Sequence, residues 1–390
     1  MRKTFRNGSI FFGYTFAAMS ITSVLITCHP ADAQPPANTT TTRAATTTTA
    51  SGAAGAEERP KAKLPNVKIL ATGGTIAGAG TGSGYGYTSG QFSVDDLVKA
   101  VPKLDKLARL SGEQIANIGS QDMSDEVWLA LAKRCNELLA SPDVDGIVIT
   151  HGTDTMEETA YFLNLVVKSD KPIALVGSMR PATAISADGP ANLYNAVATV
   201  TSPSARDRGV LVVVNDTIHT ARNVVKTNTT NVATFESPNR GPVGVVNSGT
   251  IAWFERMDKK HTNHTEFNIG GRKDLPKVEI LYAHSNMDSS LVKSALQNGA
   301  KGIVIAGVGD GNMPKAVLET LADAAKNGIV VVRSTRLGSG LVLRNNEVDD
   351  DKLGFVASGE LNPSKSRVLL QLGLMRSKDP RKLQTFFEQY

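Results

Sequence analysis

The sequence contains little cysteine, because Cys28 and Cys135 are the only two in 390 residues. Cys28 lies in an amino-terminal segment with the features of a secretory signal, so the processed chain would keep Cys135 alone. No intramolecular disulfide is therefore expected. Cys135 ends a helical pattern over residues 127–135, where a single cysteine is typical of a small buried side chain rather than a nucleophile.

Patterns that bind metals and nucleotides are also missing. No histidine pair has the H-x-x-x-H or H-E-x-x-H spacing of a helical zinc site, so no metal is predicted. Neither G-x-x-x-x-G-K-[ST] nor G-x-G-x-x-G occurs between Gly73 and Gly90, which argues against a phosphate-binding loop. His261 and His264 lie in a polar stretch and are expected to be exposed. His151, beside a glycine turn, could be a base or a residue that supports the turn.

Long runs of basic residues are absent, although Lys and Arg outnumber Asp and Glu by 42 to 37 and the pI is near 9.0. A nucleic-acid-binding domain is expected to concentrate such charges in a patch or a stripe. Here they are spread along the chain. No nucleic-acid partner is predicted.

Residues 1–33 have the pattern of a secretory signal peptide. Basic residues precede an apolar run from about residue 10 to 26, and Ala31-Asp32-Ala33 supplies a small-x-small cleavage site. Polar interruptions and the lack of a stop-transfer signal argue against the alternative of a transmembrane anchor. A lipid-modified Cys28 is a further alternative, but Thr27 is a poor residue before such a cysteine. We therefore expect export to the periplasm and no membrane attachment after cleavage.

Beyond the signal, residues 34–63 are dominated by Thr, Ala, Pro and Gly. They cannot bury enough apolar surface to offset their ordering entropy, so we expect a disordered tether. From Leu64 onward, strand-like and helix-like segments alternate. β-branched runs predict strands over residues 67–72, 147–150, 173–176, 210–214, 278–282, 302–306 and 329–333. Apolar residues at helical spacing predict helices over residues 94–100, 124–140, 156–167 and 191–201.

This alternation predicts an α/β protein with mostly parallel sheets. We expect a larger N-terminal doubly wound parallel-sheet domain over residues 64–254 and a smaller C-terminal α/β domain over residues 277–390. Residues 255–276 between them are polar and lack periodicity, so they predict a linker.

Two stretches share one plan of strand, glycine turn and hydroxyl. Residues 67–78 run from a β-branched strand through two glycines to Thr75, and residues 145–155 run from a second strand through a glycine to Thr153. Ligands of open α/β sheets bind at the carboxyl ends of the strands. Two strand ends that offer threonines therefore predict one site.

A threonine is a weak nucleophile at neutral pH, so it needs a base within hydrogen-bond reach and donors aimed at the developing oxyanion. Thr75 is followed by Tyr87 in a glycine-rich loop, and Thr153 is followed directly by Asp154. Lys226 lies among small polar residues after a later strand. A lysine held against a carboxylate in a dry pocket can exchange a proton with a hydroxyl. Thr153, Lys226 and Asp154 would then act as a triad.

Six short motifs occur together in this chain. They lie at residues 71–77 (ATGGTIA), 119–123 (GSQDM), 150–160 (THGTDTMEETA), 179–181 (MRP), 186–190 (SADGP) and 226–228 (KTN). Their content and order closely resemble those of bacterial type II L-asparaginases and glutaminase-asparaginases. The resemblance runs from Leu64 to Tyr390, and its two separate threonine motifs make it specific.

The resemblance implies hydrolysis of L-asparagine to L-aspartate and ammonia through a threonine acyl-enzyme, with no metal or organic cofactor. Thr75 matches the nucleophile and Tyr87 matches the loop tyrosine that assists it. Thr153, Asp154 and Lys226 match the family's second threonine triad. The resemblance also implies substrate-binding roles for Gly74, Ser120, Gln121, Gly152, Thr153, Asp154 and Ser178, and for Asn312 and Glu347 supplied by a neighbouring subunit.

In the resembling family, the subunits form a homotetramer that is a dimer of intimate dimers, so we expect the same assembly here. Two residues depart from the family pattern. Ser169 stands where some relatives have one half of a disulfide, so that crosslink is not expected. Ser178 stands where an alanine is common, and its hydroxyl could alter the donors near the leaving group.

Two alternatives remain open. A glutaminase-asparaginase of broader amide specificity would be distinguished by its rates on asparagine and glutamine. A periplasmic amino-acid binding protein without catalysis would keep Ser120, Gln121 and Asp154 but need not keep the hydroxyl pair. Thr75, Thr153 and Lys226 are nevertheless all present. The presence of these three residues argues against it.

Overall fold

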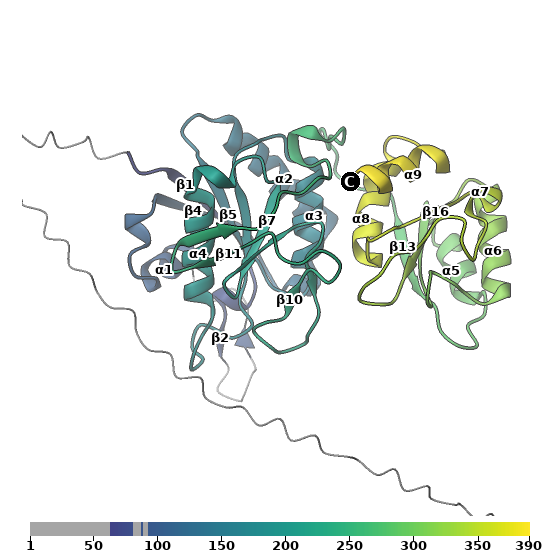
Figure 1. The fold of residues 1–390 in the computed structure, drawn as a ribbon, viewed down its shortest axis with the longest axis horizontal. Coiled ribbons are helices and arrows are strands. Elements are labelled where there is room, and N and C mark those ends of the chain that lie inside the picture. Colours follow the sequence, from purple (N-terminus) through teal and green to yellow (C-terminus); the bar gives the residue numbers. More distant parts are fainter. Residues whose placement is uncertain (1–62, 81–86, 89–92) are drawn as a thin grey trace, which may run out of the picture. The chain divides into compact units, whose positions relative to one another are not determined.

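The computed structural model describes residues 63–80, 87–88 and 93–390 (Figure 1). The expected signal peptide with Cys28, and the expected tether up to residue 62, lie outside the described residues. Within the described part of the chain, every helix is too short or too polar to cross a membrane.

The larger sheet has a parallel centre. Its strands, in sheet order, are β12 (Thr250–Trp253), β11 (Gly244–Asn247), β8 (Thr217–Thr220), β7 (Val210–Val214), β6 (Ile173–Val176), β5 (Gly146–Thr150), β1 (Asn66–Gly73) and β4 (Arg109–Ile118). Strands β4, β1, β5, β6 and β7 are parallel, whereas β8, β11 and β12 add antiparallel pairs. Strands β5, β6 and β7 are buried throughout, as expected of parallel strands covered on both faces. The prediction of a mostly parallel sheet is confirmed.

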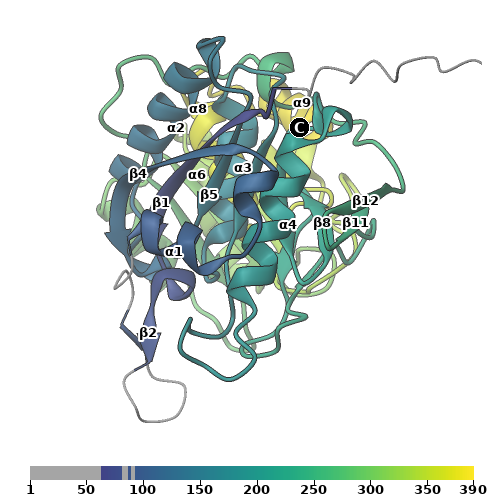
Figure 2. The ribbon, with the colours of Figure 1, turned by 90° about the vertical axis from the view of Figure 1, so that its left-hand side faces the viewer.

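Helices cover both faces of this sheet. The helices are α1 (Val94–Ala100) and α4 (Gly189–Thr201) on one face, and α2 (Asp125–Ala140) and α3 (Met156–Val166) on the other. Successive side chains of a strand point to opposite faces, so Ile69 and Val148 pack with α1 and α4. Leu70 and Ile149 pack with α2 and α3. Figure 2 shows α1 and α4 in front of the sheet, and the predicted doubly wound arrangement is confirmed.

The smaller sheet is fully parallel. Its strands, in sheet order, are β13 (Val278–Tyr282), β14 (Gly302–Gly307), β15 (Val330–Thr335) and β16 (Phe355–Ala357). The helices around it are α5 (Ser290–Gln297) and α6 (Lys315–Lys326) on one face, and α8 (Pro363–Leu374) and α9 (Pro380–Gln389) on the other. The predicted smaller α/β domain is therefore confirmed.

One apolar core joins the two sheets. Helices α3 and α8 pack against each other between them (Figure 1). Phe162 and Leu165 of α3 and Leu369 and Leu370 of α8 are fully buried members of the same cluster. Burial of apolar surface between two domains stabilises their association. The smaller domain is therefore held directly against α3, the helix that follows the second threonine turn.

The segment between the two sheets is anchored by a few buried residues, although most of its residues are exposed. Phe267 is fully buried in the shared core, and His261 is only 6% exposed. The expectation that His261 is exposed is therefore wrong, whereas His264 keeps a side chain that is 54% exposed. The lack of periodicity over residues 255–276 concealed the few residues that anchor the segment.

Lys168, just beyond α3, holds this segment in place. Its ammonium donates to the carbonyl oxygens of Thr262 and Thr265 at 3.3 and 2.9 Å, and to Thr265 Oγ1 at 2.6 Å. Partial burial lowers the pKa of Lys168 to about 8, so the ammonium form that makes these contacts predominates at pH 7.

A buried ion pair organises the loops of the smaller domain. Arg333 on β15 forms two parallel hydrogen bonds with Asp350, of 2.6 and 2.7 Å, and neither side chain is exposed. Arg333 also donates to the carbonyls of Asp310 and Leu343. The pair therefore fixes the two loops that carry Asn312 and Glu347.

Removing one partner of this pair should destabilise the fold. Asp350→Ala leaves the Arg333 guanidinium buried without its counter-charge, so we expect the free energy of unfolding to fall by about 3–5 kcal/mol. Chemical denaturation of the two proteins measures the difference.

The matched control is the exposed pair of Arg206 and Asp170, which are 48% and 47% exposed. Asp170→Ala should cost less than about 1 kcal/mol, because solvent screens an exposed pair. Equal losses in the two variants would show that burial does not set the strength of the Arg333 pair.

Candidate functional site

The two threonine turns follow neighbouring strands. Strands β1 and β5 are adjacent and parallel, so their carboxyl ends lie at one edge of the sheet. After β1, Gly74 has a φ of 83° and Thr75 begins the short 3-10 turn η1 (Thr75–Ala77). After β5, His151 and Gly152 lead to Thr153. The two predicted turns thus share the edge where ligands of open α/β sheets bind.

The backbones of the two turns touch through glycines. A Cβ atom on Gly74 would lie 2.4 Å from the nitrogen of Gly152, and a Cβ atom on Gly152 would lie 2.6 Å from Ser120 Oγ. Glycine is therefore required at both positions for the backbones to approach. This contact brings the segments that carry Thr75, Thr153 and Ser120 together.

Ser120 supports the second turn. Its Oγ accepts a hydrogen bond of 3.1 Å from the N–H of Asp154, and its carbonyl accepts one of 2.7 Å from Thr155 Oγ1. Ser120 is buried, whereas Gln121 is exposed and donates to the carboxylate of Asp122 at 3.2 Å. Ser120 therefore orients the turn, and Gln121 lies at its surface.

Lys226 contacts both of its predicted partners. It lies in β9 (Val225–Lys226), a short strand that pairs with β10 (Phe235–Glu236). Its Nζ donates to Thr153 Oγ1 at 3.0 Å and to Asp154 Oδ1 at 2.6 Å. The Lys226 side chain is 16% exposed and that of Asp154 is 55% exposed. The structure thus places a lysine within proton-transfer distance of a threonine hydroxyl, with a carboxylate beside it.

Thr75 is 5% exposed, and its carbonyl accepts a hydrogen bond of 2.9 Å from the N–H of Gly78. No hydrogen bond joins its hydroxyl to another described residue. The backbone of Tyr87 lies in β3 (Tyr87–Thr88), opposite Gly80 in β2 (Ala79–Gly80). The side chain of Tyr87 lies outside what the structure describes, so its predicted role beside Thr75 stays a prediction.

Ser178 is engaged within its own loop. The residue is 2% exposed, and its hydroxyl donates to the carbonyl of Arg180 at 2.8 Å. The carboxylate of Asp188 accepts from the backbone N–H groups of Met179 and Arg180 at 2.9 Å each. A Cβ atom on Gly189 would lie 3.2 Å from Ile76 Cγ1 and 3.5 Å from Ser178 Cβ, so this loop adjoins the Thr75 turn.

His151 supports its turn in this structure. The ring is fully buried, and Nδ1 lies 2.7 Å from the carbonyl oxygen of Gly152. A carbonyl only accepts, so Nδ1 must carry the hydrogen. Burial lowers the pKa of His151 to about 4, although the hydrogen bond to Gly152 opposes the shift. A neutral, buried ring that donates to the turn favours the supporting role over that of a base.

Cys135 is buried, as its helical pattern predicted, and carries a free thiol. Burial raises the pKa of this thiol to about 12. Because the thiolate is the nucleophilic form, Cys135 does not supply a reactive sulfur at neutral pH.

Glu157 is a site residue that sequence reasoning missed. It lies in the first turn of α3, one turn beyond Asp154, and its Oε2 accepts a hydrogen bond of 2.9 Å from the backbone N–H of Lys226. Glu157 is only 8% exposed. The available signal was an acidic residue in a mostly apolar helix, since a carboxylate that such a helix buries must find partners.

Asn312 and Glu347 lie together in the smaller domain, where Asn312 Nδ2 donates to Glu347 Oε2. Glu347 is exposed. Among the described residues, no hydrogen bond or ion pair joins either of them to Thr75, Thr153 or Lys226. The structure of one chain therefore does not bring together the full predicted set.

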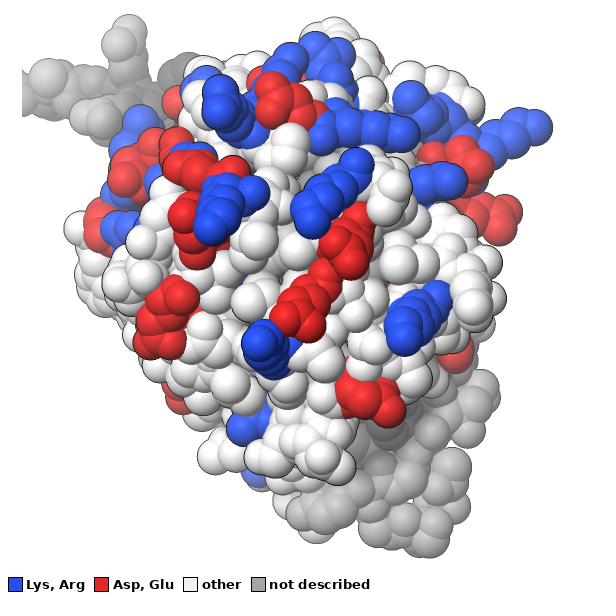
Figure 3. Space-filling model, turned by 90° about the vertical axis from the view of Figure 1, so that its right-hand side faces the viewer, with Lys and Arg blue, Asp and Glu red and all other residues white. Residues whose placement is uncertain are grey.

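The described residues contain no cluster of three or more His, Cys, Asp and Glu side chains that could hold a metal ion. On the face that Figure 3 shows, blue Lys and Arg side chains are interspersed with red Asp and Glu side chains. That face thus presents a mixed charge rather than a basic patch. The polar groups that meet at the second turn are a threonine hydroxyl, a lysine and a carboxylate.

Two protein-family profiles match the chain. One, described as "Asparaginase, N-terminal", covers residues 66–259, and the other, "Glutaminase/Asparaginase C-terminal domain", covers residues 277–387.

Individual relatives agree with this match. L-asparaginase 2 of Escherichia coli is 55% identical over 328 residues, which are 84% of this chain and 94% of that protein. A glutaminase-asparaginase of Pseudomonas fluorescens is 47% identical, over 86% of this chain and 93% of that protein. The crystal structure of a probable cytoplasmic L-asparaginase from Campylobacter jejuni matches with a TM-score of 0.78 and 49% identity, over 84% of this chain and 100% of that one.

The contact between the glycine turns predicts a specific pattern of stability. Gly74→Ala adds a methyl group against the backbone of Gly152, whereas Gly241 has a similar φ of 77° with no atom within 4 Å of the added group. Gly241→Ala should cost about 1–2 kcal/mol for the left-handed backbone alone. Gly74→Ala should cost a further 1–3 kcal/mol, roughly, for the overlap and for its ψ of −177°, which at positive φ is open almost only to glycine. Urea denaturation of both variants measures this difference, and equal losses would contradict the close approach.

Proposed function

This chain belongs to the asparaginase family, whose reaction is hydrolysis of the asparagine side-chain amide, and we propose that it performs this reaction through a covalent intermediate on Thr75. The observation that supports the proposal best is the contact of Lys226 with Thr153 and Asp154 at 3.0 and 2.6 Å. Thr153 and Asp154 lie on the turn that packs against the Thr75 turn, and Lys226 contacts them from β9. A hydroxyl paired with a lysine is an arrangement for acyl transfer rather than for binding alone.

The proposed reaction has two displacements. In the first, Thr75 Oγ attacks the side-chain amide carbon of asparagine, and its proton passes to the departing nitrogen. The C–N bond then breaks, ammonia leaves and an aspartyl ester remains on Thr75. In the second, water attacks the ester carbonyl, the C–O bond to Thr75 breaks, and L-aspartate leaves. The water's proton returns to the threonine oxygen.

Lys226 is proposed to exchange the required proton through the Thr153 hydroxyl that it contacts. The neighbouring Asp154 carboxylate keeps the Lys226 side chain close to this hydroxyl through their ion pair. Its 55% exposed side chain is also available to meet the α-ammonium group of the substrate. The rest of the substrate pocket would be lined by backbone groups of Gly74 and Gly152 and by Ser120, Gln121 and Ser178.

The range of amides is a separate question. The relative from P. fluorescens carries the name glutaminase-asparaginase, and that from E. coli carries the name L-asparaginase. We assign asparagine as the substrate and retain glutamine as the alternative. Ammonia release measured with each amide, at matched concentrations, distinguishes the two.

Export and assembly are further parts of the proposal. Residues 1–33 would be removed as a signal peptide, residues 34–63 would tether the domain over 64–254, and the chain would act in the periplasm. A relative from Haemophilus influenzae, 54% identical, is named a probable periplasmic L-asparaginase, whereas the C. jejuni neighbour is named cytoplasmic. Mass measurement of the secreted protein tests the cleavage site.

The chain is proposed to form a homotetramer, a dimer of intimate dimers. Asn312 and Glu347 lie in the smaller domain, and among the residues that the structure describes no hydrogen bond or ion pair joins them to Thr75 or Thr153 of the same chain. Leu337, Leu341 and Leu343, in the loop before Glu347, are 53%, 52% and 49% exposed. Exposed apolar side chains of this kind mark interaction surfaces. A two-fold axis that places this loop against a neighbour would complete two equivalent sites.

The nucleophile assignment is tested by replacing Thr75. Thr75→Ala should fold normally and lose about 10³-fold or more in kcat, as removal of a nucleophile does. Thr75→Ser keeps a hydroxyl and is the matched control, so it should retain a larger share of the activity. Mass spectrometry after an acid quench should find the aspartyl ester on the Thr75 peptide. An ester on the Thr153 peptide would instead reverse the roles of the two threonines.

The shared site is tested by mixing Thr75→Ala and Glu347→Ala subunits, each of low activity alone. After dissociation and reassociation, a mixed dimer contains one site with both wild-type residues. Random pairing should therefore restore about one quarter of the parent activity. If mixed dimers form and the activity stays at the level of the separate variants, each site is built within one chain.

A further inference from the structure

The carboxylate of Glu157 lies between the strand that carries Lys226 and the smaller domain. Its Oε2 accepts from the backbone N–H of Lys226 at 2.9 Å, and its Oε1 accepts from Asn362 Nδ2 at 2.9 Å. Lys365 Nζ lies 3.9 Å from Oε2. Both oxygens are therefore used, one by the domain with the threonines and one by the domain with α8.

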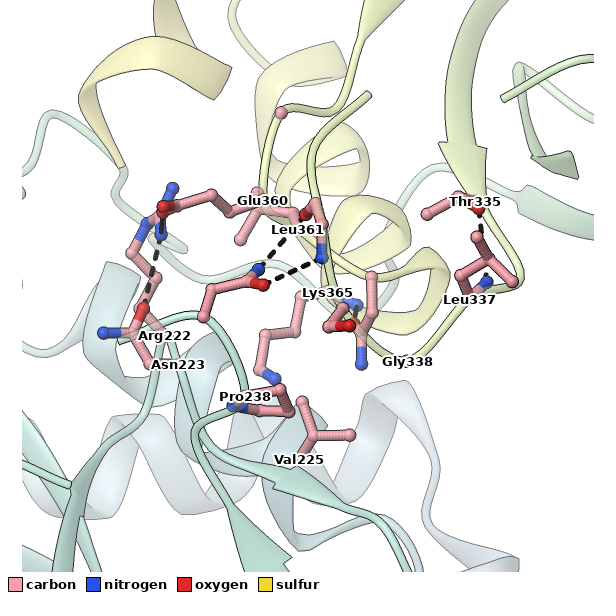
Figure 4. A pocket seen from close by; sticks show the side chains of 15 residues that line it. Arg222, Asn223, Val225, Pro238, Thr335, Leu337, Gly338, Glu360, Leu361 and Lys365 are labelled. Carbon is pink, nitrogen blue, oxygen red and sulfur yellow. Dashed lines mark hydrogen bonds and ion pairs between the residues drawn. The ribbon is translucent and has the colours of Figure 1, made fainter. Parts of the chain in front are cut away.

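Lys365 holds the same strand from its other side. Its side chain is 1% exposed, and its Nζ donates to the carbonyl of Val224, two residues before Lys226. Figure 4 shows the Lys365 side chain extending from the smaller domain toward Val225 and Pro238. The ion pair of Glu157 and Lys365 thus binds the backbone on both sides of Val225, at the N–H of Lys226 and at the carbonyl of Val224.

Asn362 links this pair to the start of α8. Its amide nitrogen donates to Glu157, and its oxygen accepts from the N–H of Lys365 at 3.0 Å as the amino-terminal cap of the helix. The packing of α8 on α3 then sets the position of the Glu157 carboxylate. Glu157, Asn362 and Lys365 are named the Glu157 network below.

Burial makes this network sensitive to the loss of either charge. Burial lowers the pKa of Lys365, and Glu157 opposes this shift. A buried ammonium without its carboxylate would have to lose its proton or draw in water. Either change would alter the backbone that holds Lys226, because Lys365 contacts that backbone directly.

We propose that Glu157 is a positioning residue, which, with Asn362 and Lys365 of the smaller domain, sets the place of the Lys226 ammonium against Thr153. The inference rests on the proposed proton-transfer role of Lys226. It adds a dependence of the reaction on how the two domains of one chain dock. Displacing a reacting group by about 1 Å can cost about 10²-fold in rate, so a shift of β9 is expected to lower turnover.

The first experiment compares Glu157→Gln and Lys365→Met with the parent enzyme. Each should lower kcat for asparagine about 10-fold or more. KM should stay within about twofold, because neither residue is among those proposed to bind the substrate. Asn362→Ser, which keeps a helix-capping hydroxyl but removes the donor to Glu157, should lower kcat less and in the same direction.

The control for a purely structural role is Glu360→Gln. Glu360 also joins the two domains, through hydrogen bonds of 2.5 Å to Arg222 and 2.8 Å to Arg240, and its side chain is 15% exposed. This variant should lower the melting temperature while kcat stays within about twofold of the parent. If Glu157→Gln and Glu360→Gln lower kcat equally at equal loss of melting temperature, the network acts only through stability and the proposal is wrong.

The second experiment asks whether Glu157 acts through Lys226. Lys226→Met alone should lose most of kcat. Glu157→Gln added to Lys226→Met should then have no further effect, because residues that act through one group are not additive. If the double variant instead shows the product of the two single effects, Glu157 acts independently of Lys226, which overturns the proposal. Full activity of Lys226→Met would sink the proposed function of Lys226 itself, whatever Glu157→Gln does.

If Glu157→Gln does not fold, Asn362→Ser carries the same test, since it leaves both charges of the network in place. Added to Lys226→Met, Asn362→Ser should again cause no further loss of kcat. A loss that persists there would count against positioning through Lys226.

Discussion

The close approach of Gly74 and Gly152 is the constraint on which the site depends. The backbones of the two turns touch at positions where a single Cβ atom would overlap with its neighbour. The turns that carry Thr75 and Thr153 come from segments far apart in the sequence, and they approach each other closely because neither has a side chain at the contact. The parallel pairing of β1 with β5 supplies the alignment, and glycine supplies the distance.

Charges in and around this site are held by partners from several segments. Lys226 meets Asp154, while Glu157 meets Asn362 and Lys365. A buried ion pair contributes little to stability when compared with apolar packing of the same volume, so its value lies in the geometry that it specifies. In this chain the apolar contact between α3 and α8 holds the two domains together. The polar groups fix the orientation in which the domains pack.

The sequence predicted those helices and strands in which the pattern of apolar residues matches the pattern of burial. Strands β5, β6 and β7 are apolar throughout, and helix α2 shows a clear apolar face, so their existence and approximate bounds followed. Strand β4 was missed because it is an edge strand of half-buried and exposed residues, and β8, β11 and β12 are short antiparallel additions. The contact of Thr153, Lys226 and Asp154 was predictable, since a hydroxyl with a lysine and a carboxylate has a recognisable chemistry. Glu157 was not, because its partner Asn362 lies 205 residues away and nothing local indicates the pairing.

Thr153 and Thr75 differ in the contacts of their hydroxyls. The Thr153 hydroxyl accepts a hydrogen bond from Lys226, whereas no hydrogen bond joins the Thr75 hydroxyl to another described residue. Yet Asp154 is more than half exposed, and an ion pair open to solvent is weak because water screens it. The attraction between the Lys226 ammonium and the Asp154 carboxylate therefore strengthens when a surface covers Asp154 and excludes water. A neighbouring subunit that brings Asn312 and Glu347 to the substrate would provide such a surface, so assembly would strengthen the same electrostatic contacts that the reaction uses.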